Sequence, residues 1–195
     1  MSYKSYMTYK TYKTYFSSIK PSYEKLVVYW LTVDIFDLTV IFCEKYIRKN
    51  NRTFDQMTQA ARSGKQNITE GPLSRSVESN LKLISVAQAS YGELLEDFRD
   101  FLRQKNIKIW DKNDPRILKM RQLGPSYKTY RTYETYKSYL SNPETFANLM
   151  ITLCFKQGYL LDKLLVALKE KFIREGGFRE NLFKARVNFR NKKKK

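Results

Sequence analysis

The stretch Ser76–Lys105, SVESNLKLISVAQASYGELLEDFRDFLRQK, decides the fold class of this chain. Side chains suited to a protein interior recur in it every three or four residues, at Leu81, Ile84, Gln88, Tyr91, Leu95, Phe98 and Leu102. An α-helix has 3.6 residues per turn, so this spacing places them along one side of a helix. The pattern predicts a long helix that starts near Ser74 or Ser76 and buries this side.

A second predicted helix precedes it, from about Tyr23 to Arg48, with Ser22 as its cap. Two of its faces are apolar, which predicts burial on two sides. One side would face the rest of the fold. The other would meet a further partner, and this is our first reason to expect self-association.

Two more helices are marked by start and stop residues. One begins at the capping box Thr53–Gln56 and ends at Gly71-Pro72. The other begins after the cap Asn142, with Pro143 in its first turn, and ends at Gly176-Gly177. Small residues in the first of these, including Gly64, predict a close approach by a neighbouring helix.

Four long helices without a convincing strand predict an all-α fold, an antiparallel up-down four-helix bundle with a long low-complexity insertion between helices three and four. We expect a repeat over 1–21, the bundle over 22–177 and a flexible basic tail over 178–195. The insertion spans 106–142 and holds a short helix that starts at Pro115.

A three-residue Tyr/Lys repeat occurs twice, as SYKSYMTYKTYKTY from Ser2 and SYKTYRTYETYKSY from Ser126. A period of three gives neither a helical face nor a strand face. One interpretation is base stacking on tyrosine with lysine on phosphate. The other is a duplicated DNA unit tolerated at a terminus and a loop tip, in which case deleting either copy leaves the bundle folded.

The chain is strongly basic, with a formal net charge of +18 over 195 residues. Such an excess indicates a polyanionic partner, RNA or DNA. The predicted binding residues are Arg62, Lys65, Arg75 and Lys82 around the junction of helices two and three, and Lys184, Arg186 and Arg190 in the tail. The alternative for the first group is an ordinary solvated face.

Composition also argues against several classes of protein. The chain has no histidine, which removes the commonest general base and zinc ligand. Cys43 and Cys154 have no CxxC spacing and are expected to be buried thiols in a reducing cytoplasm. Asp34 and Asp37 interrupt the longest apolar run, so we expect no membrane span.

The segment Gln56–Leu102 contains a set of motifs found together in one family. Asn67-Ile68-Thr69-Glu70-Gly71 is followed by Arg75-Ser76 and then by Ala87, Ser90 and Glu93. This combination resembles the four-helix bundle proteins encoded in intervening sequences of bacterial 23S rRNA genes. The insertion and the extended last helix are similar to its branch with a four helix bundle suffix domain. Gly64-Lys65 and Thr69 depart from the family pattern.

The resemblance implies a bundle without known catalytic activity. The family includes the accessory variability determinant protein of diversity-generating retroelements, a basic homopentamer that binds nucleic acid and a reverse transcriptase. For this chain the resemblance therefore implies a homo-oligomer, with a pentamer as one possible state. It also implies nucleic acid and a reverse transcriptase as partners.

The motif residues themselves favour structural roles over catalysis. Asn67 and Glu70 cannot perform two-carboxylate hydrolysis, since no second acid is fixed beside them. We expect Asn67 to cap or cross-link helices and Glu70 to pair with Arg75. The acidic residues of helix three, including Glu93, lack the histidines of a di-metal bundle. We therefore expect no enzyme activity, no cofactor and no metal.

These expectations combine into a cytoplasmic, non-catalytic, nucleic-acid-binding oligomer. The alternative is a protein-interaction adaptor for a reverse transcriptase or a ribosome-associated partner, in which the positive charge serves only to steer association.

Overall fold

The computed structural model describes residues 22–74, 76–126 and 132–192, and it confirms the all-α class. These residues form helices and no strand. The four long helices are α2 (Val27–Tyr46), α3 (Arg52–Glu70), α4 (Val77–Gln104) and α7 (Pro143–Glu175). The shorter ones are the 3-10 helices η1 (Ser22–Lys25), η2 (Gly71–Leu73) and η3 (Lys137–Tyr139), and α5 (Pro115–Gln122), α6 (Thr132–Tyr136) and α8 (Phe178–Lys192).

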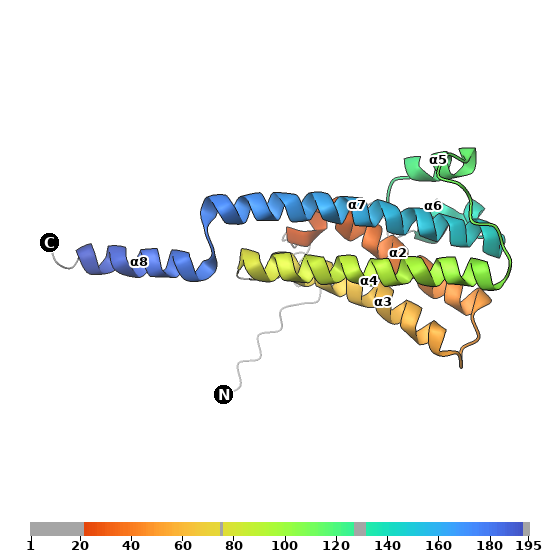
Figure 1. Ribbon diagram of the computed structural model, residues 1–195, viewed down its shortest axis with the longest axis horizontal. Coiled ribbons are helices and arrows are strands. Elements are labelled where there is room, and N and C mark those ends of the chain that lie inside the picture. The colour runs from red at the N-terminus through yellow and green to blue at the C-terminus, as the bar shows by residue number, and fades with distance from the viewer. Residues whose placement is uncertain (1–21, 75, 127–131, 193–195) are drawn as a thin grey trace, which may run out of the picture.

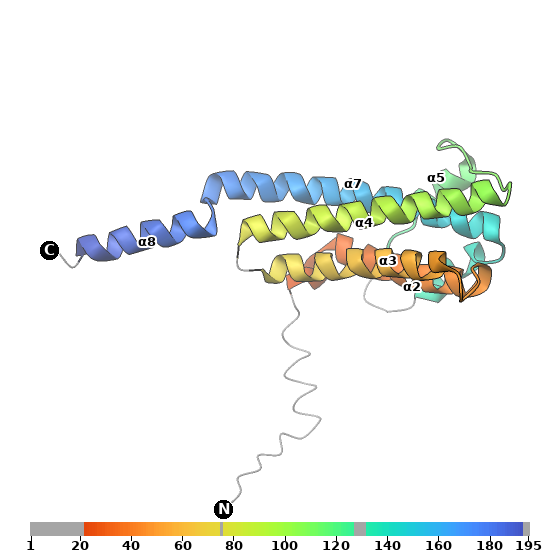
Figure 2. The same ribbon diagram turned by 60° about the horizontal axis from the view of Figure 1, so that its bottom comes forward.

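The four long helices lie side by side and are called the helical core below (Figures 1 and 2). Helix α4 packs against α3 and α7, and α2 also packs against α3 and α7. The colours in Figure 1 show that the chain reverses direction from each long helix to the next. At one end of the core the Phe42 ring, fully buried, meets Phe98, Phe101 and Phe146 edge to face, with centroids 4.8 to 5.2 Å apart.

Two of the four predicted helix caps are correct. The Ser76 hydroxyl accepts from the backbone N–H of Ser79, and Asn142 Oδ1 accepts from that of Thr145. Ser22 does not cap the first helix. It begins η1 instead, and α2 starts after Leu26 without a side-chain cap.

Thr53 is not the cap of α3 either. Asn51 takes that role, and its Oδ1 accepts from the Thr53 N–H at 2.9 Å. Asparagine caps as well as threonine does, and the sequence NNRT offers both, so the pattern did not separate them.

The predicted close approach of a helix at Gly64 is confirmed. The Tyr91 ring of α4 lies over this residue, and a Cβ there would come within 2.6 to 2.9 Å of three atoms of the ring. Tyr91 is fully buried as a result. The missing side chain of Gly64 is therefore what lets α3 and α4 pack at this short separation.

The insertion folds back onto the helical core instead of forming a loop tip. Asp34 of α2 is fully buried, and its carboxylate accepts from the Ser126 N–H at 2.7 Å and from the Ser126 hydroxyl. It also accepts from the Tyr136 hydroxyl at 3.0 Å. Ser126 and Tyr136 belong to the second Tyr/Lys repeat, so part of this copy packs on α2 and is not an open loop tip. That the bundle stays folded without either copy stays a prediction. The first copy lies outside the described residues.

This arrangement also corrects the argument for self-association from the first helix. Helices η1 and α6 pack on α2, and the side chains from Val28 to Ile35 are all buried within the chain. The second apolar side of α2 therefore has an intramolecular partner. Asp34 occurs in this apolar run because Ser126 and Tyr136 satisfy its carboxylate.

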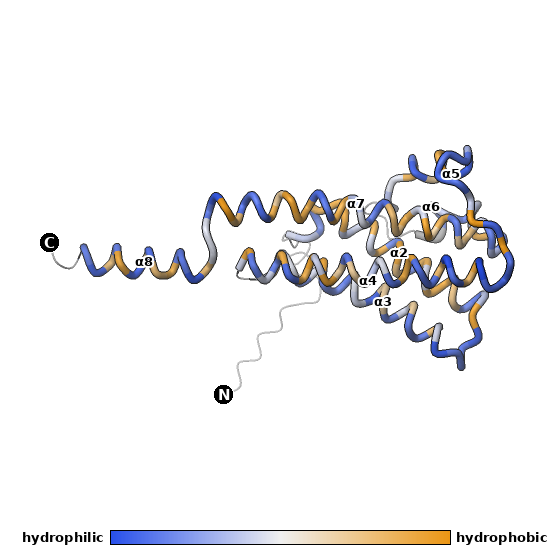
Figure 3. Tube along the Cα trace, in the orientation of Figure 1, coloured by the Kyte–Doolittle hydropathy of each residue, from blue (hydrophilic) through white to orange (hydrophobic). Residues whose placement is uncertain are grey.

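The predicted flexible tail is largely a helix. Gly176, with φ of 75°, ends α7 in a backbone conformation that favours glycine, and α8 follows. Helix α8 projects away from the core and has no buried residue (Figures 1 and 2). Apolar residues alternate with polar ones along it (Figure 3). Among the described residues, no helix is long and apolar enough to cross a membrane.

Candidate nucleic-acid interface

The basic residues predicted around the α3–α4 junction belong to two helices and to the segment between them. Arg62 and Lys65 are on α3, Lys82 is on α4, and Arg75 lies outside the described residues. Lys65 is half-buried, and its Nζ lies 4.5 Å from the centre of the Phe36 ring of α2. Its ammonium group therefore already makes a cation–π contact within the protein.

The predicted basic residues of the tail are on α8. Lys184, Arg186 and Arg190 are all exposed. Lys184 Nζ lies 2.6 Å from Glu180 Oε1, one turn earlier, and this lysine holds the pKa of Glu180 below its usual value. The remaining cations of α8 give a basic helix that is open to partners along its length.

The bonds of the Asn67 side chain lie within α3, so the predicted cap or cross-link between helices is not seen among the described residues. Asn67 Nδ2 donates to the Ser63 carbonyl at 2.9 Å and to the Ser63 hydroxyl at 3.3 Å, both within α3. Ser90 of α4 donates to the same hydroxyl at 3.4 Å, so the link between the helices passes through Ser63. Gly71 is the C-cap of α3, and its N–H donates to the Asn67 carbonyl.

The two acidic motif residues make no such link. Glu70 and Glu93 are exposed, and the partner predicted for Glu70, Arg75, is outside the described residues. Elsewhere on α4, Glu96 and Asp100 form exposed ion pairs with the arginines three residues later. Within the described ranges, no three acidic, cysteine or histidine side chains gather as metal ligands would.

A groove lies between the second half of α4, the connection 105–114, α5 and α7. Its volume is about 910 Å³. The lining includes five basic side chains and one acidic side chain: Arg99, Lys108, Lys112, Arg121 and Lys156, with Asp111. We call it the α4–α7 groove. The excess of cations makes it a positively charged site in an already basic protein.

The floor of the groove is one face of α7. Asn148, Ile151, Thr152, Phe155 and Tyr159 are spaced by three and four residues and share this face. Phe155 and Tyr159 are 52 and 61 % exposed, unusual values for large rings on a core helix. The Arg99 guanidinium lies 5.1 Å from the Phe155 ring centre. Lys163 Nζ lies 5.5 Å from the Tyr159 ring centre, so a cation lies over one face of each half-exposed ring.

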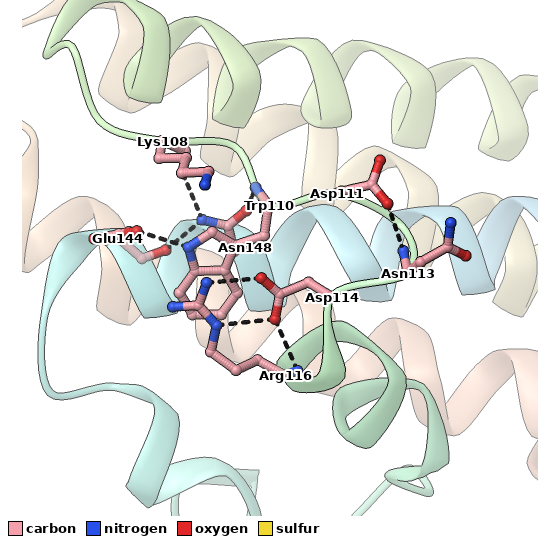
Figure 4. Close-up of polar contacts among 8 residues, drawn as sticks. All are labelled: Lys108, Trp110, Asp111, Asn113, Asp114, Arg116, Glu144 and Asn148. Carbon is pink, nitrogen blue, oxygen red and sulfur yellow. Dashed lines mark hydrogen bonds and ion pairs between the residues drawn. The ribbon is translucent and has the colours of Figure 1, made fainter.

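One wall of the groove is fixed by polar contacts around Trp110 (Figure 4). The Trp110 N–H donates to Asn148 Oδ1 at 2.8 Å, and its indole Nε1 donates to Glu144 Oε1 at 2.6 Å. Asn148 Nδ2 in turn donates to the Lys108 carbonyl at 3.0 Å. These bonds hold the connection against the first turns of α7, so the wall is rigid without regular structure of its own.

Arg116 covers the Trp110 ring from the side of α5. Its guanidinium lies 3.6 Å from the ring centre, and Asp114 accepts from Arg116 Nε and Nη2 at 2.9 and 2.7 Å. These bonds lower the pKa of Asp114 to about 2. Trp110 is only 7 % exposed, so it supports the wall and is not itself an open stacking surface.

Lys156 links the groove floor on α7 to the end of α5. Its Nζ donates to the Leu123 carbonyl at 2.7 Å and to the Arg121 carbonyl at 3.3 Å, at the end of α5. Partial burial lowers the pKa of Lys156. A smaller hollow, lined by Gly92, Gly158 and the same two aromatic rings among others, continues the groove along the α4–α7 seam.

The sequence predicted none of these groove residues as a site. The connection before Pro115 has no helical period, and the apolar stripe of α7 through Leu149, Leu153 and Leu161 faces inward. A usable signal was present: Phe155 and Tyr159 are four residues apart and outside that inward stripe, with Lys156 and Lys163 beside them. A second aromatic stripe flanked by lysines on a core helix marks a surface that something else can use.

Comparisons of the chain with protein-family models, with curated proteins and with solved structures found no match. The resemblance stated for Gln56–Leu102 therefore rests on the quoted motifs alone. The function has to be argued from the charge and geometry of the described residues.

Proposed function

We propose that this chain is a non-catalytic protein that binds RNA or DNA. The observation that supports this best is the α4–α7 groove, in which five cations and one carboxylate line the same hollow. Cations that line a concave, partly apolar surface attract a polyanion more strongly than the same charges spread over a convex surface. The net charge of +18 acts in the same direction over the whole molecule.

The basic helix α8 supplies a second contact region in this proposal. Its exposed Lys184, Arg186 and Arg190 suit phosphate contacts, which add affinity without sequence preference. Of the predicted junction residues, Arg62 and Lys82 are exposed and can contribute in the same way. Lys65 contributes less, since its ammonium already contacts Phe36.

We further propose that the helical core is an antiparallel four-helix bundle of the type found in the 23S rRNA intervening-sequence proteins, and that the chain forms a homo-oligomer. Support for oligomerisation comes from large apolar side chains left exposed on α7 and α8, where Ile173, Leu182 and Phe183 are 81, 55 and 67 % exposed. Groups of this kind commonly mark protein contacts. A pentamer is the state that the resemblance implies.

The same exposed apolar residues favour a second candidate function. An adaptor would use α8 and the end of α7 to hold a protein such as a reverse transcriptase, and the positive charge would only accelerate the encounter. The observation in its favour is that α8 has no buried residue, although apolar side chains occur along it.

Salt dependence separates the two candidates. We would measure binding of a fluorescent RNA strand and of a DNA duplex to the full chain by anisotropy, over a series of salt concentrations. A nucleic-acid binder loses affinity linearly in the logarithm of salt, with a slope of about −0.7 to −0.9 for each phosphate contacted. Absence of binding at low salt would overturn the proposal and leave the adaptor. Light scattering on the same samples gives the number of subunits.

A further inference from the structure

The geometry points to a single-stranded segment of nucleic acid as the occupant of the α4–α7 groove, with unpaired bases stacked on Phe155 and Tyr159. This inference rests on the proposed function and adds the site and the strandedness. Its first support is the pair of half-exposed rings on the groove floor. An unpaired base has a free π-face and can stack on such a ring, whatever its identity.

The cations are placed for the phosphates of such a strand. Lys108 and Lys112 are exposed on the connection, Arg121 is exposed on α5, and Arg99 is on α4 beside Phe155. Arg99 is ion-paired with Glu96 at 2.6 Å, so the exposed cations of the connection and α5 are the ones most open to a phosphate. A strand whose bases point to the floor therefore has cations near its backbone, as in channels that bind single strands.

The length of the floor suits a short segment. The two exposed rings of the floor are four residues apart, so they lie about 6 Å apart along the helix, at about 1.5 Å per residue. A stacked strand advances about 3.4 Å per nucleotide, so the two rings suit about two neighbouring bases. The hollow at Gly92 and Gly158 extends the same seam, and added Cβ atoms there would meet nothing within 4 Å.

A duplex fits this site less well, because its bases are stacked on each other and offer no free face to Phe155 or Tyr159. It can reach only the cations on the rims. A second copy of the chain is also disfavoured, since a protein of net charge +18 would bring further cations to a groove that already holds five. Charge complementarity thus selects a polyanion, and the exposed rings select an unpaired one.

The test compares the full chain with a Phe155→Leu/Tyr159→Leu variant. Leucine keeps apolar bulk at two partly exposed positions but removes both π-faces. We expect affinity for a labelled single strand of about ten nucleotides to fall at least about tenfold, as expected when base stacking is lost. Affinity for a duplex of the same length should change less than about twofold.

A matched control is Val86→Ala/Val166→Ala, which removes exposed apolar groups from α4 and α7 outside the groove. It should leave both affinities unchanged.

The cations of the connection are tested by the salt dependence of binding. Lys108→Gln/Lys112→Gln should lower the salt slope for the single strand by about one to two. Lys49→Gln, at an exposed position between α2 and α3, should leave the slope unchanged. The melting temperature of every variant should match that of the full chain.

A second readout uses the groove wall directly. In a Trp30→Phe background, Trp110 is the remaining tryptophan, and we expect its emission to change when the single strand binds. If the leucine variant lost affinity equally for the single strand and the duplex, or lost no affinity for either, the inference would be overturned. The proposal of nucleic-acid binding would remain. A change of subunit number in that variant at unchanged affinity would identify the groove as a protein contact. Failure of the full chain to bind any nucleic acid would refute the proposed function itself.

Discussion

The two ends of the molecule use apolar and charged residues in opposite ways. At the end where α7 begins, the insertion folds back, buries Asp34 and Trp110 and completes a crowded interior. At the end where α7 stops, α8 continues as a helix that buries none of its side chains. The comparison shows that helical periodicity indicates which face of a helix can be buried. Whether that face is buried depends on the segments that pack against it.

The largest expected effect comes from removing one phenylalanine at each end. Phe42→Ala removes a buried ring that contacts four other rings, so the free energy of unfolding should fall by about 3–5 kcal/mol. Phe183→Ala removes a ring that is 67 % exposed on α8 and should change it by less than about 0.5 kcal/mol. Urea unfolding of both variants measures the contrast. A loss at Phe183 close to that at Phe42 would mean that α8 is packed.

The next effect concerns the buried carboxylate that holds the insertion. Asp34→Ala removes the acceptor of the Ser126 N–H and leaves the Tyr136 hydroxyl with the Gly124 carbonyl at 3.2 Å, so it should lower the free energy of unfolding by about 1–3 kcal/mol. Tyr136→Phe, which removes one hydroxyl, should cost about 1 kcal/mol. A double-mutant cycle by urea unfolding measures their coupling. Strictly additive losses would contradict the contact between α2 and the second repeat.

Substitution by alanine should lower the stability of the protein at Gly64 and raise it at Gly92. Gly64→Ala places a methyl group against the Tyr91 ring and should cost about 1–3 kcal/mol, because α3 and α4 must separate. Gly92→Ala meets nothing within 4 Å and replaces a poor helix former, so it should raise stability by about 0.5–1 kcal/mol. Thermal unfolding of the two variants measures both changes in stability. Destabilisation by both would show that the α4–α7 seam is closed at Gly92.

Stability should also fall at alkaline pH because of buried neutral groups. Burial raises the pKa of the Cys43 thiol to about 12 and also raises the pKa values of Cys154, Tyr91 and Tyr136. In the unfolded chain these groups lose protons near their ordinary pKa values of 9.0 and 10.0, whereas the folded chain keeps them.

Unfolding then releases protons, and above pH about 9 the free energy of unfolding should fall with rising pH. The slope is up to about 1.4 kcal/mol per pH unit for each group. Urea unfolding between pH about 7 and about 10.5 measures it, and Tyr136→Phe, with one such group fewer, should show a smaller slope above pH about 10. A stability that stays constant across this range would contradict the burial of these four side chains.

How far the sequence predicts this molecule differs between its parts. The long helices follow from local patterns: the stripe through Ile84, Tyr91 and Phe98 is buried, and the caps Ser76 and Asn142 are as predicted. Such features need only neighbours within a few residues. The class of the fold was therefore accessible from the sequence, and the helix boundaries were accessible to within a few residues.

The site depended on contacts between distant segments. Trp110 reaches Asn148 and Glu144 across more than thirty residues, and Asp34 reaches Ser126 across 92. No local period encodes such pairs, so only the short helix at Pro115 could be predicted within the insertion, and the groove beside it was missed. The predicted junction residues were chosen for charge and proximity in sequence, which does not reveal that Lys65 packs over Phe36 of α2.

The most direct measurement of where nucleic acid binds is photo-crosslinking of the full chain to a single-stranded RNA that carries a photoreactive base, followed by mass spectrometry of the peptides. We expect crosslinks at Phe155 and Tyr159 in the α4–α7 groove, with weaker ones on α8, and we expect an excess of unlabelled single strand to remove them. Crosslinks confined to α8 or to the surface around Arg62 and Lys82, with none at the two rings, would contradict a function centred on the groove.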